Sequence, residues 1–168
     1  LLGRRVLVTG AAGGVGRFAV RLASLAGAYV IASVGSFERG EGLGADEVVV
    51  GLDGIGTPVD VVLDNVGGPQ LVAAWRLLAE GGSLQSIGWA SGQPAVFPPY
   101  STIGPAKSLT SFVNTGPVGA DLAELVALLA AGDLSVAIGW RGPLADFAVA
   151  AAALRERRVS GKAVLDLA

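Results

Sequence analysis

The chain has 168 residues, of which 26 are glycine and none is cysteine, histidine or methionine. Charged residues make up only 15% of it, well below the roughly 25% of an average globular protein. Without Cys or His the chain has no disulfide and no thiol or imidazole catalyst. For the same reason we expect no metal site. A formal charge of −2 provides no basic field for nucleic acid or an anionic membrane. We therefore expect binding to neither. The sequence also has no apolar run of the roughly 18 residues that a spanning helix needs and no recognisable leader at its start, so we expect a cytoplasmic protein.

The start of the chain and its hydropathy both bear on domain organisation. At 168 residues the chain has the length of one domain, which we expect to span residues 1–168. It begins Leu1-Leu2 rather than with methionine, and its mean hydropathy is +0.61. Because a domain cut from a larger protein exposes surface that its partner covered, we expect a fragment of a larger protein.

Short apolar runs rich in β-branched residues alternate along the chain with segments of helical periodicity. Strands are expected at Arg4–Gly10, Tyr29–Val34, Glu47–Val50, Val59–Leu63, Ser83–Ile87, Leu109–Val113 and Ala163–Leu167, with an extended piece at Val136–Trp140. Helices are expected at Val15–Leu25, Ser36–Leu43, Pro69–Glu80, Asp121–Ala131 and Leu144–Arg157. This alternation predicts an α/β fold: a doubly wound, mainly parallel six-stranded sheet with helices on both faces.

The segment from Trp89 to Pro105 interrupts this alternation and is rich in proline and glycine. It is longer than most connections between elements, which favours a binding loop over a simple connector. Its aromatic residues either form a wall beside a ligand or fasten the loop to the rest of the fold.

The turn between the first strand and the first helix carries the sharpest motif. It reads VTGAAGGVG from Val8 to Gly16, which is G-x-G-x-x-G with Ala11 in place of the first glycine. In this pattern Gly13 lets backbone approach a pyrophosphate, and Gly16 lets the helix pack closely on the strand. The amides near Val15 point along the helix dipole, which favours an anion. The turn predicts a dinucleotide site in a Rossmann fold; a tight turn without cofactor and a methyltransferase turn are the alternatives.

The end of the second predicted strand bears on which dinucleotide is bound. About 20 residues beyond the glycine turn, NAD-preferring proteins place an Asp or Glu that binds the ribose hydroxyls. Here the stretch reads ASVGS, and no acid occurs before Glu38. Ser33, Ser36 and Arg39 instead offer hydrogen-bond donors that suit a 2′-phosphate. The pattern favours NADP(H) over NAD(H), unless Arg39 is only a solvated helix residue.

Two dehydrogenase families have glycines in this arrangement. The T-G-x-x-x-G-x-G spacing that begins at Thr9 also fits short-chain dehydrogenases, whose catalysis needs a Tyr followed four residues later by a Lys. Neither Tyr29 nor Tyr100 is followed by a lysine at that spacing. The short-chain interpretation therefore lacks its catalyst.

The remaining motifs resemble the cofactor-binding half of the medium-chain dehydrogenase/reductase superfamily, particularly its zinc-independent quinone oxidoreductase branch. They are VLVTGAAGGVG, AGAYVIASV, LGAD at 43–46, VDVVLDNVGG at 59–68, GGSLQSIG at 81–88 and GKAVL at 161–165. The resemblance covers nearly the whole chain. It implies an oxidoreductase that transfers hydride from NADPH to a quinone or an α,β-unsaturated carbonyl. The protein would orient the reactants and would form no covalent bond with them.

The resemblance also implies contacts for the cofactor, although no catalytic and no metal-binding residue. The expected contacts are Ala11, Gly13, Gly14 and Val15 at the diphosphate; Ser33, Ser36 and Arg39 at the 2′-phosphate; Asn65 and Val66 beside the adenosine or the nicotinamide ribose; Ile87 and Gly88 at the nicotinamide; and Phe112 and Val113 at the carboxamide. One departure is Gly51, where relatives often carry a tyrosine that supports the adenosine side.

In such relatives a GroES-like catalytic domain precedes this segment and supplies most of the substrate pocket. We expect that N-terminal domain to be absent here, residues 116–168 to pack near it, and the chain alone to be nearly inactive. A homodimer through the sixth strand, Leu109–Val113, is expected because an unpaired edge strand invites pairing. The alternatives are a zinc-dependent alcohol dehydrogenase cofactor domain and a non-catalytic, NADP(H)-responsive binding module.

Asp64 and Asn65 directly follow the fourth predicted strand, at the edge where ligands of open α/β sheets collect. A carboxylate at this position can act as an acid or can hold the backbone of the next loop. We interpret Asp64 as the structural residue that holds backbone amides there, and not as a catalytic acid.

Overall fold

The structure is a computed structural model that describes residues 1–167. It divides into two compact units, Leu1–Asn114 and Thr115–Ala168, and each is described by itself. Within the described residues, none of the helices combines the length and the hydrophobicity that crossing a membrane requires.

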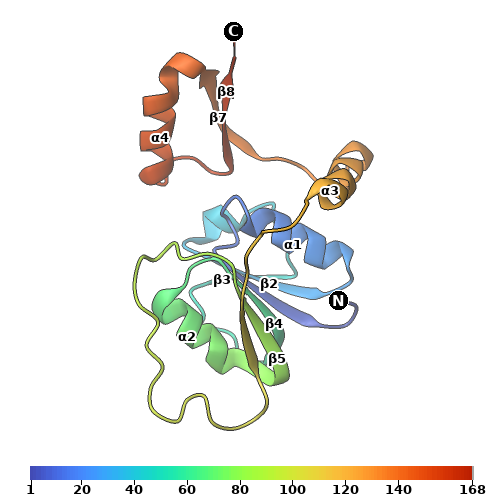
Figure 1. The fold of residues 1–168 in the computed structure, drawn as a ribbon, viewed down its shortest axis with the longest axis vertical. Helices are drawn as coiled ribbons and strands as arrows, with labels where there is room; N and C mark the ends of the chain where they lie inside the picture. The colour runs from blue at the N-terminus through green and yellow to red at the C-terminus, as the bar shows by residue number, and fades with distance from the viewer. Residues whose placement is uncertain (168) are drawn as a thin grey trace. The chain divides into compact units, whose positions relative to one another are not determined.

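The first unit is built on one parallel sheet (Figure 1). Its strands are β1 (Arg5–Thr9), β2 (Tyr29–Val34), β3 (Glu47–Val50), β4 (Val59–Asp64), β5 (Leu78–Ser86) and β6 (Ser108–Ser111). They lie in the order β3-β2-β1-β4-β5-β6, and every neighbouring pair is parallel. The strand order therefore reverses between β1 and β4, which is the switch point of a doubly wound sheet. The predicted fold class is confirmed.

Helices α1 (Gly16–Leu25) and α2 (Gly68–Leu77) lie on opposite faces of this sheet, as Figure 1 shows. Successive strand residues point to opposite faces, so Val6 packs in the core with Val20 of α1, while Leu7 packs with Leu71 of α2. All four side chains are at most 2% exposed. Because both faces are covered, the central strands read as continuous apolar runs rather than alternating ones.

Two helices of this unit are shorter than the sequence predicted. The helix expected at Ser36–Leu43 is a single 3₁₀ turn, η1 (Phe37–Gly40), which ends where Glu41 turns to extended backbone. The glycines at 42 and 44, which have positive φ values, do not continue the helix. The helix expected to reach Glu80 ends at Leu77, because Leu78 turns to extended backbone and enters the core beside β4. Strand β5 therefore begins five residues earlier than expected.

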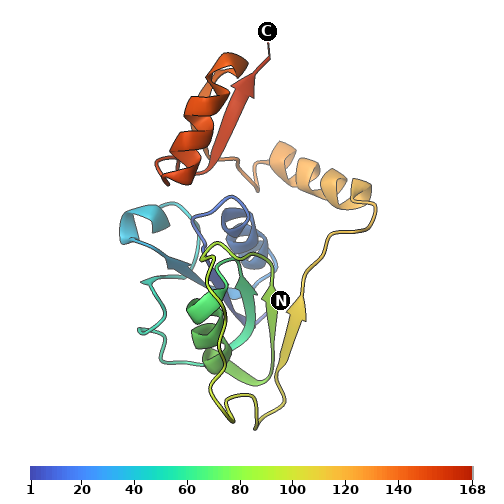
Figure 2. The same ribbon diagram turned by 60° about the vertical axis from the view of Figure 1, so that its left-hand side comes forward.

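The second unit contains α3 (Gly119–Ala131), β7 (Ile138–Pro143), the 3₁₀ turn η2 (Leu144–Asp146), α4 (Phe147–Arg155) and β8 (Lys162–Asp166). Figure 2 shows β8 running alongside α4, and β8 pairs in parallel with β7 in a separate two-stranded sheet. The predicted closing strand thus exists, shifted by one residue. The helix expected at Leu144–Arg157 splits in two and ends at Arg155, and Arg157 has a φ of 57°.

Candidate functional site

The carboxyl ends of the central strands meet along one edge of the six-stranded sheet. Thr9 of β1 is in register with Ser33 of β2, and Asp64 of β4 is in register with Ser86 of β5. Ser86 is in turn paired with Ser111 of β6. Loops that leave these positions are therefore brought side by side, so the predicted site residues gather on one edge.

The glycine turn connects β1 to α1 at the switch point. Gly10 has a φ of 60°, and the amide of Gly13 donates to the carbonyl of Gly10 at 2.9 Å. A Cβ on Gly16 would overlap that same carbonyl and would lie 2.7 Å from the Cα of Ala11. Only glycine fits at position 16, because the first turn of the helix lies directly against the strand end. This is the close helix–strand approach that the motif predicted.

The outer side of the turn faces solvent. Ala11 is fully buried, whereas Gly13 is exposed, Gly14 is half-buried and Val15 is 55% exposed. Helix α1 begins at Gly16 and has no acidic residue in its first turn. The positive end of the helix dipole is therefore presented to solvent beside backbone that carries no bulky side chain, which suits an anionic group.

A buried hydrogen-bond network fixes the ends of β1 and β4. Both carboxylate oxygens of Asp64 accept hydrogen bonds, one from the hydroxyl of Thr9 at 2.5 Å and one from the amide of Gly67 at 2.8 Å. Asp64 and Thr9 are both 0% exposed. The structural role expected for Asp64 is confirmed, since its carboxylate holds the loop that follows β4.

Asn65 joins the same two strands from the opposite direction. Its side-chain amide donates to the carbonyl of Thr9 at 3.0 Å, and its backbone amide donates to the Thr9 hydroxyl at 3.1 Å. The next residue, Val66, lies against Gly10, where a Cβ would be 3.2 Å from its Cγ2. The loop after β4 therefore packs directly against the glycine turn.

The loop after β5 approaches the same place. The amides of Ile87 and Gly88 donate to the carbonyl of Asp64 at 2.8 and 3.1 Å. A Cβ on Gly88 would lie 2.9 Å from the carbonyl oxygen of Asn65, so glycine permits this approach. The structure thus brings Asn65, Val66, Ile87 and Gly88 together beside the glycine turn.

Phe112 and Val113 follow β6, whose strand is Ser108–Ser111 rather than the expected Leu109–Val113. The amide of Phe112 donates to the carbonyl of Ser86 at 3.0 Å, which anchors it to the end of β5. Their side chains are 56% and 69% exposed. Both residues lie on the same edge as the loop after β5.

The three residues expected at a 2′-phosphate have different surroundings. Ser33 is 1% exposed, and its hydroxyl donates to the carbonyl of Gly51 at 2.9 Å and accepts from the side chain of Gln70 at 3.0 Å. Ser36, which directly precedes η1, and Arg39, which lies in it, are both half-buried. A hydrogen bond from the Ser36 hydroxyl is the main cause that lowers the pKa of the Glu38 carboxyl. In this structure the Ser33 hydroxyl therefore links the end of β2 to Gly51 and to α2. Its contact with a phosphate stays a prediction.

Gln70 is a neighbour of this edge that the sequence did not predict, and Trp89 is one of the loop aromatics for which a ligand wall or a fastening role was expected. Gln70, on the first turn of α2, reaches across to Ser33 and links α2 to the end of β2. The ring of Trp89 lies over Gly67, where a Cβ would be 2.5 Å from it, and its indole nitrogen donates to the carbonyl of Gln93 at 2.6 Å. Gly67, which has no side chain, leaves room for this ring.

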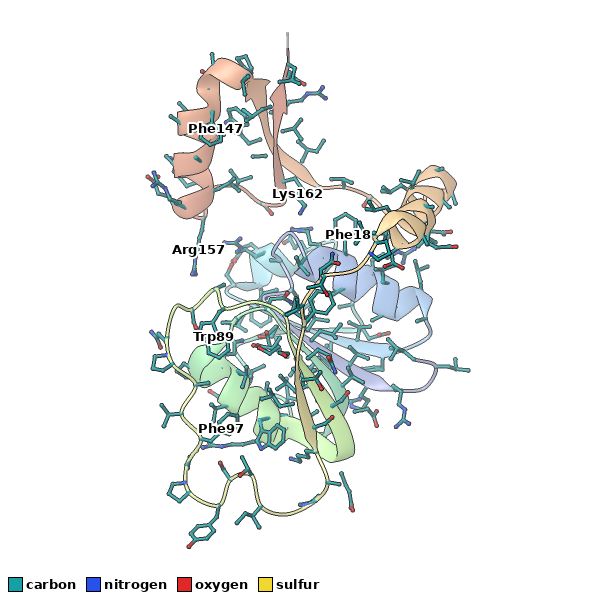
Figure 3. The ribbon with its side chains drawn as sticks, in the orientation of Figure 1. Phe18, Trp89, Phe97, Phe147, Arg157 and Lys162 are labelled. Atoms are coloured by element: carbon teal, nitrogen blue, oxygen red, sulfur yellow. The ribbon has the colours of Figure 1, made fainter. Side chains whose placement is uncertain are left out.

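The rest of the loop after β5 is fastened along α2. The rings of Phe97 and Trp75 meet edge to face at 5.9 Å, and the indole nitrogen of Trp75 donates to the carbonyl of Ser101 at 3.1 Å. Figure 3 shows Trp89 near the start of α2 and Phe97 farther along that helix. Phe97 therefore fastens the loop, and Trp89 covers the turn that precedes α2.

Residues 43–165 match the model of the zinc-binding dehydrogenase family. Among curated proteins, prostaglandin reductase-3 of Bos taurus is 39% identical over 54% of the chain and 27% of its own length. Acryloyl-coenzyme A reductase of Metallosphaera sedula is 38% identical over 51% of the chain and 28% of its own. A mycocerosic acid synthase-like polyketide synthase of Mycolicibacterium smegmatis is 30% identical over 98% of the chain and 9% of its own. The chain thus spans less than a third of the length of each of these relatives.

Solved structures agree over almost the whole chain. AibC superposes with a TM-score of 0.89 at 33% identity, over 99% of this chain and 50% of AibC. A mycobacterial quinone oxidoreductase gives 0.82 at 28% identity, over 98% of this chain and 57% of its own. A mycobacterial protein complexed with NADPH gives 0.85 at 29% identity with the same coverage.

The family model, the strand order and the glycine turn all indicate the same family. The matched residues run from just before β3 into β8, and the turn after β1 has the geometry of a dinucleotide-binding motif. The chain belongs to the zinc-binding dehydrogenase family, and it is a nucleotide-binding domain of the medium-chain dehydrogenase/reductase superfamily.

Proposed function

We propose that this chain binds NADP(H) across the carboxyl edge of its sheet, as part of an oxidoreductase that reduces a quinone or an α,β-unsaturated carbonyl. The observation that carries the proposal is the turn from Gly10 to Gly16, which admits no Cβ at its last position and faces solvent at the start of α1. The NADPH complex of a structural relative supports the cofactor. The names of the reductase relatives support the substrate class.

In this proposal the diphosphate lies on the backbone of Gly13, Gly14 and Val15, beside the buried Ala11. Ser36 and Arg39 hold the 2′-phosphate, because a guanidinium and a hydroxyl together provide several donors. Ser33 joins them only if its hydroxyl exchanges the carbonyl of Gly51 for the ligand. The preference for NADP(H) over NAD(H) rests on these side chains.

The nicotinamide half is oriented by the loops after β4, β5 and β6. Their residues toward the cofactor are Asn65, Val66, Ile87, Gly88, Phe112 and Val113. When bound, NADPH supplies the hydride for reduction. The chain's own contribution is to hold and orient the ring, which is the part a protein plays in hydride transfer.

We further propose that the two units, residues 1–168, together form one nucleotide-binding domain of a larger protein. Residues 116–168 then pack near a GroES-like domain that supplies the substrate pocket, and the 168-residue chain alone has little activity. Efficient enone or quinone reduction by this chain alone would contradict that proposal. Cytoplasmic location stays a prediction.

A homodimer through β6 is also proposed. All four residues of β6 are exposed, and Figure 2 shows the strand at the outer edge of the sheet. An edge strand of this kind offers unpaired backbone groups to a second copy. Sedimentation at micromolar concentration is expected to give a dimer, and a monomer at every concentration tested would exclude it.

The family model's description favours one second candidate, a zinc-dependent alcohol dehydrogenase cofactor domain. Its metal would be held by residues outside this chain, which contains no Cys or His. Metal analysis of the full-length parent separates the two. A non-catalytic, NADP(H)-responsive module is the remaining alternative, and cofactor titration with and without a partner protein tests it.

Calorimetric titration of the chain with NADPH and with NADH tests the proposal. Tighter binding of NADPH is expected. Tighter binding of NADH would overturn the roles given to Ser36 and Arg39, and binding of neither would overturn the dinucleotide site itself.

A further inference from the structure

Phe37 is an exposed aromatic residue on the candidate binding edge. It is the first residue of η1, it directly follows Ser36, and it is 64% exposed. Phenylalanine at this exposure gains little from folding, since most of its apolar surface stays in water. The sheet core therefore does not explain an aromatic side chain at this place.

The backbone that carries Phe37 is well anchored. Ser36 is extended, with φ −157° and ψ 157°, and the 3₁₀ turn follows at once. At the other end of the turn, Gly40 lies so close to Val48 of β3 that a Cβ would overlap its side chain. Phe37 is thus presented from a short, packed element rather than from a loose loop.

We propose that Phe37 stacks on the adenine of the bound dinucleotide; this rests on the proposed function. In dinucleotide-binding sheets the adenosine ribose lies at the end of the second strand, so the attached base lies within reach of the residues that follow it. Ser36 and Arg39 are polar and suit the phosphate. Phe37 is the aromatic residue in the segment 33–41, and an aromatic face is what a base stacks on.

The neighbouring strand end gives the base room. Gly51, which follows β3, has a φ of 71°, and no atom lies within 4 Å of where its Cβ would be. Position 51 therefore presents no side chain at this end of the sheet. Position 51 carries no side chain that could stack on the base, whereas Phe37 carries an aromatic ring.

This assignment separates two contributions to affinity. Adenine is common to NADH and NADPH, so loss of the Phe37 ring weakens both ligands by the same factor. Ser36 and Arg39 face a group that only NADPH carries, so their loss weakens NADPH alone. The ratio of the two dissociation constants therefore distinguishes a base contact from a phosphate contact.

The experiment measures Kd for NADPH and NADH by calorimetry on the 168-residue chain and on Phe37→Ala, Phe37→Trp and Phe37→Leu. Phe37→Ala is expected to raise both Kd values by a similar factor, roughly 10-fold. Phe37→Trp is expected to restore binding, and Phe37→Leu to restore little of it, because leucine is apolar but has no π face. Reduced nicotinamide mononucleotide, which lacks adenosine, should bind all four proteins alike.

Phe147→Ala is the matched control, because Phe147 is 62% exposed and lies in the other unit. Its Kd values should equal those of the unmodified chain, and circular dichroism verifies that each variant is folded. Unchanged Kd values in folded Phe37→Ala, or full rescue by Phe37→Leu, would overturn the stacking role alone. An unmodified chain that binds neither dinucleotide would overturn the proposed function, and the stacking role with it.

Discussion

The hydroxyl of Thr9 donates a 2.5 Å hydrogen bond to the carboxylate of Asp64, and both side chains are fully buried. This contact joins the ends of β1 and β4 at the switch point of the sheet. A buried carboxylate is costly unless its oxygens are satisfied, and here the second oxygen accepts the amide of Gly67. The geometry of the candidate site therefore depends on a polar network beneath it.

Replacing Thr9 with valine removes the donor and keeps the shape. Thr9→Val is expected to lower the free energy of unfolding by about 2 kcal/mol, because one oxygen of a buried carboxylate is left without its partner. Thr9→Ser keeps the hydroxyl and should lose less. Urea denaturation measures both; a Thr9→Val protein as stable as the unmodified chain would contradict the network's structural role.

Gly16→Ala tests the close approach of helix and strand. A methyl group there would overlap the carbonyl of Gly10, so the turn must shift. We expect a loss of about 1 to 3 kcal/mol in stability, together with loss of dinucleotide binding. Gly56→Ala is the control, since no atom lies within 4 Å of its Cβ position. Equal behaviour of the two variants would show that the turn tolerates a side chain.

Asp60 makes stability depend on pH at the start of β1. Its carboxylate accepts the backbone amide of Arg5 at 2.8 Å and the guanidinium of Arg4 at 3.0 Å. The Arg5 amide is the main cause that lowers the pKa of Asp60 from 3.8, and Arg4 adds to it, while partial burial opposes the shift. Since the folded pKa is the lower one, the stabilisation is present above the unfolded pKa and is lost as pH falls through the folded pKa.

Asp60→Asn should therefore cost stability at pH 7, by about 1 kcal/mol or less because the group is partly exposed. The difference from the unmodified chain should shrink as pH falls below about 4. Thermal unfolding between pH 3 and 7 measures it. A difference that stays constant over that range would mean that ionisation of Asp60 plays no part.

Much of this architecture could be predicted from the sequence. The run at Arg4–Gly10 and the glycines that follow it predicted β1 and the turn, because a buried parallel strand and a close helix approach leave strong local patterns. The role of Asp64 was also predictable, since a carboxylate at a strand end readily holds loop amides. These features depend on residues close together in sequence.

The features that were not predicted depend on contacts between residues distant in sequence. The end of α2 at Leu77 was not predicted, because the burial of Leu78 beside β4 is a tertiary effect. The surroundings of Ser33 were not predicted either, because its hydroxyl contacts Gly51 and Gln70, which are 18 and 37 residues away. Such partners cannot be read from local pattern.

The preference for NADP(H) is tested at Arg39. Arg39→Gln removes the charge, and we expect the Kd for NADPH to rise by roughly 10-fold or more while the Kd for NADH is unchanged, since a charge-assisted bond is worth about 1.5–3 kcal/mol. Arg39→Lys should keep part of the preference. An equal loss for both dinucleotides would place Arg39 away from the 2′-phosphate.

Amide hydrogen exchange with and without NADPH tests the dinucleotide site most directly. We predict that NADPH slows exchange at residues 13–17 of the glycine turn and in the loops after β2, β4 and β5, while β7 and β8 are unchanged. These regions form the carboxyl edge of the sheet, where we propose that the dinucleotide binds. Unchanged exchange at residues 13–17 in the presence of saturating NADPH would show that the glycine turn does not hold the cofactor.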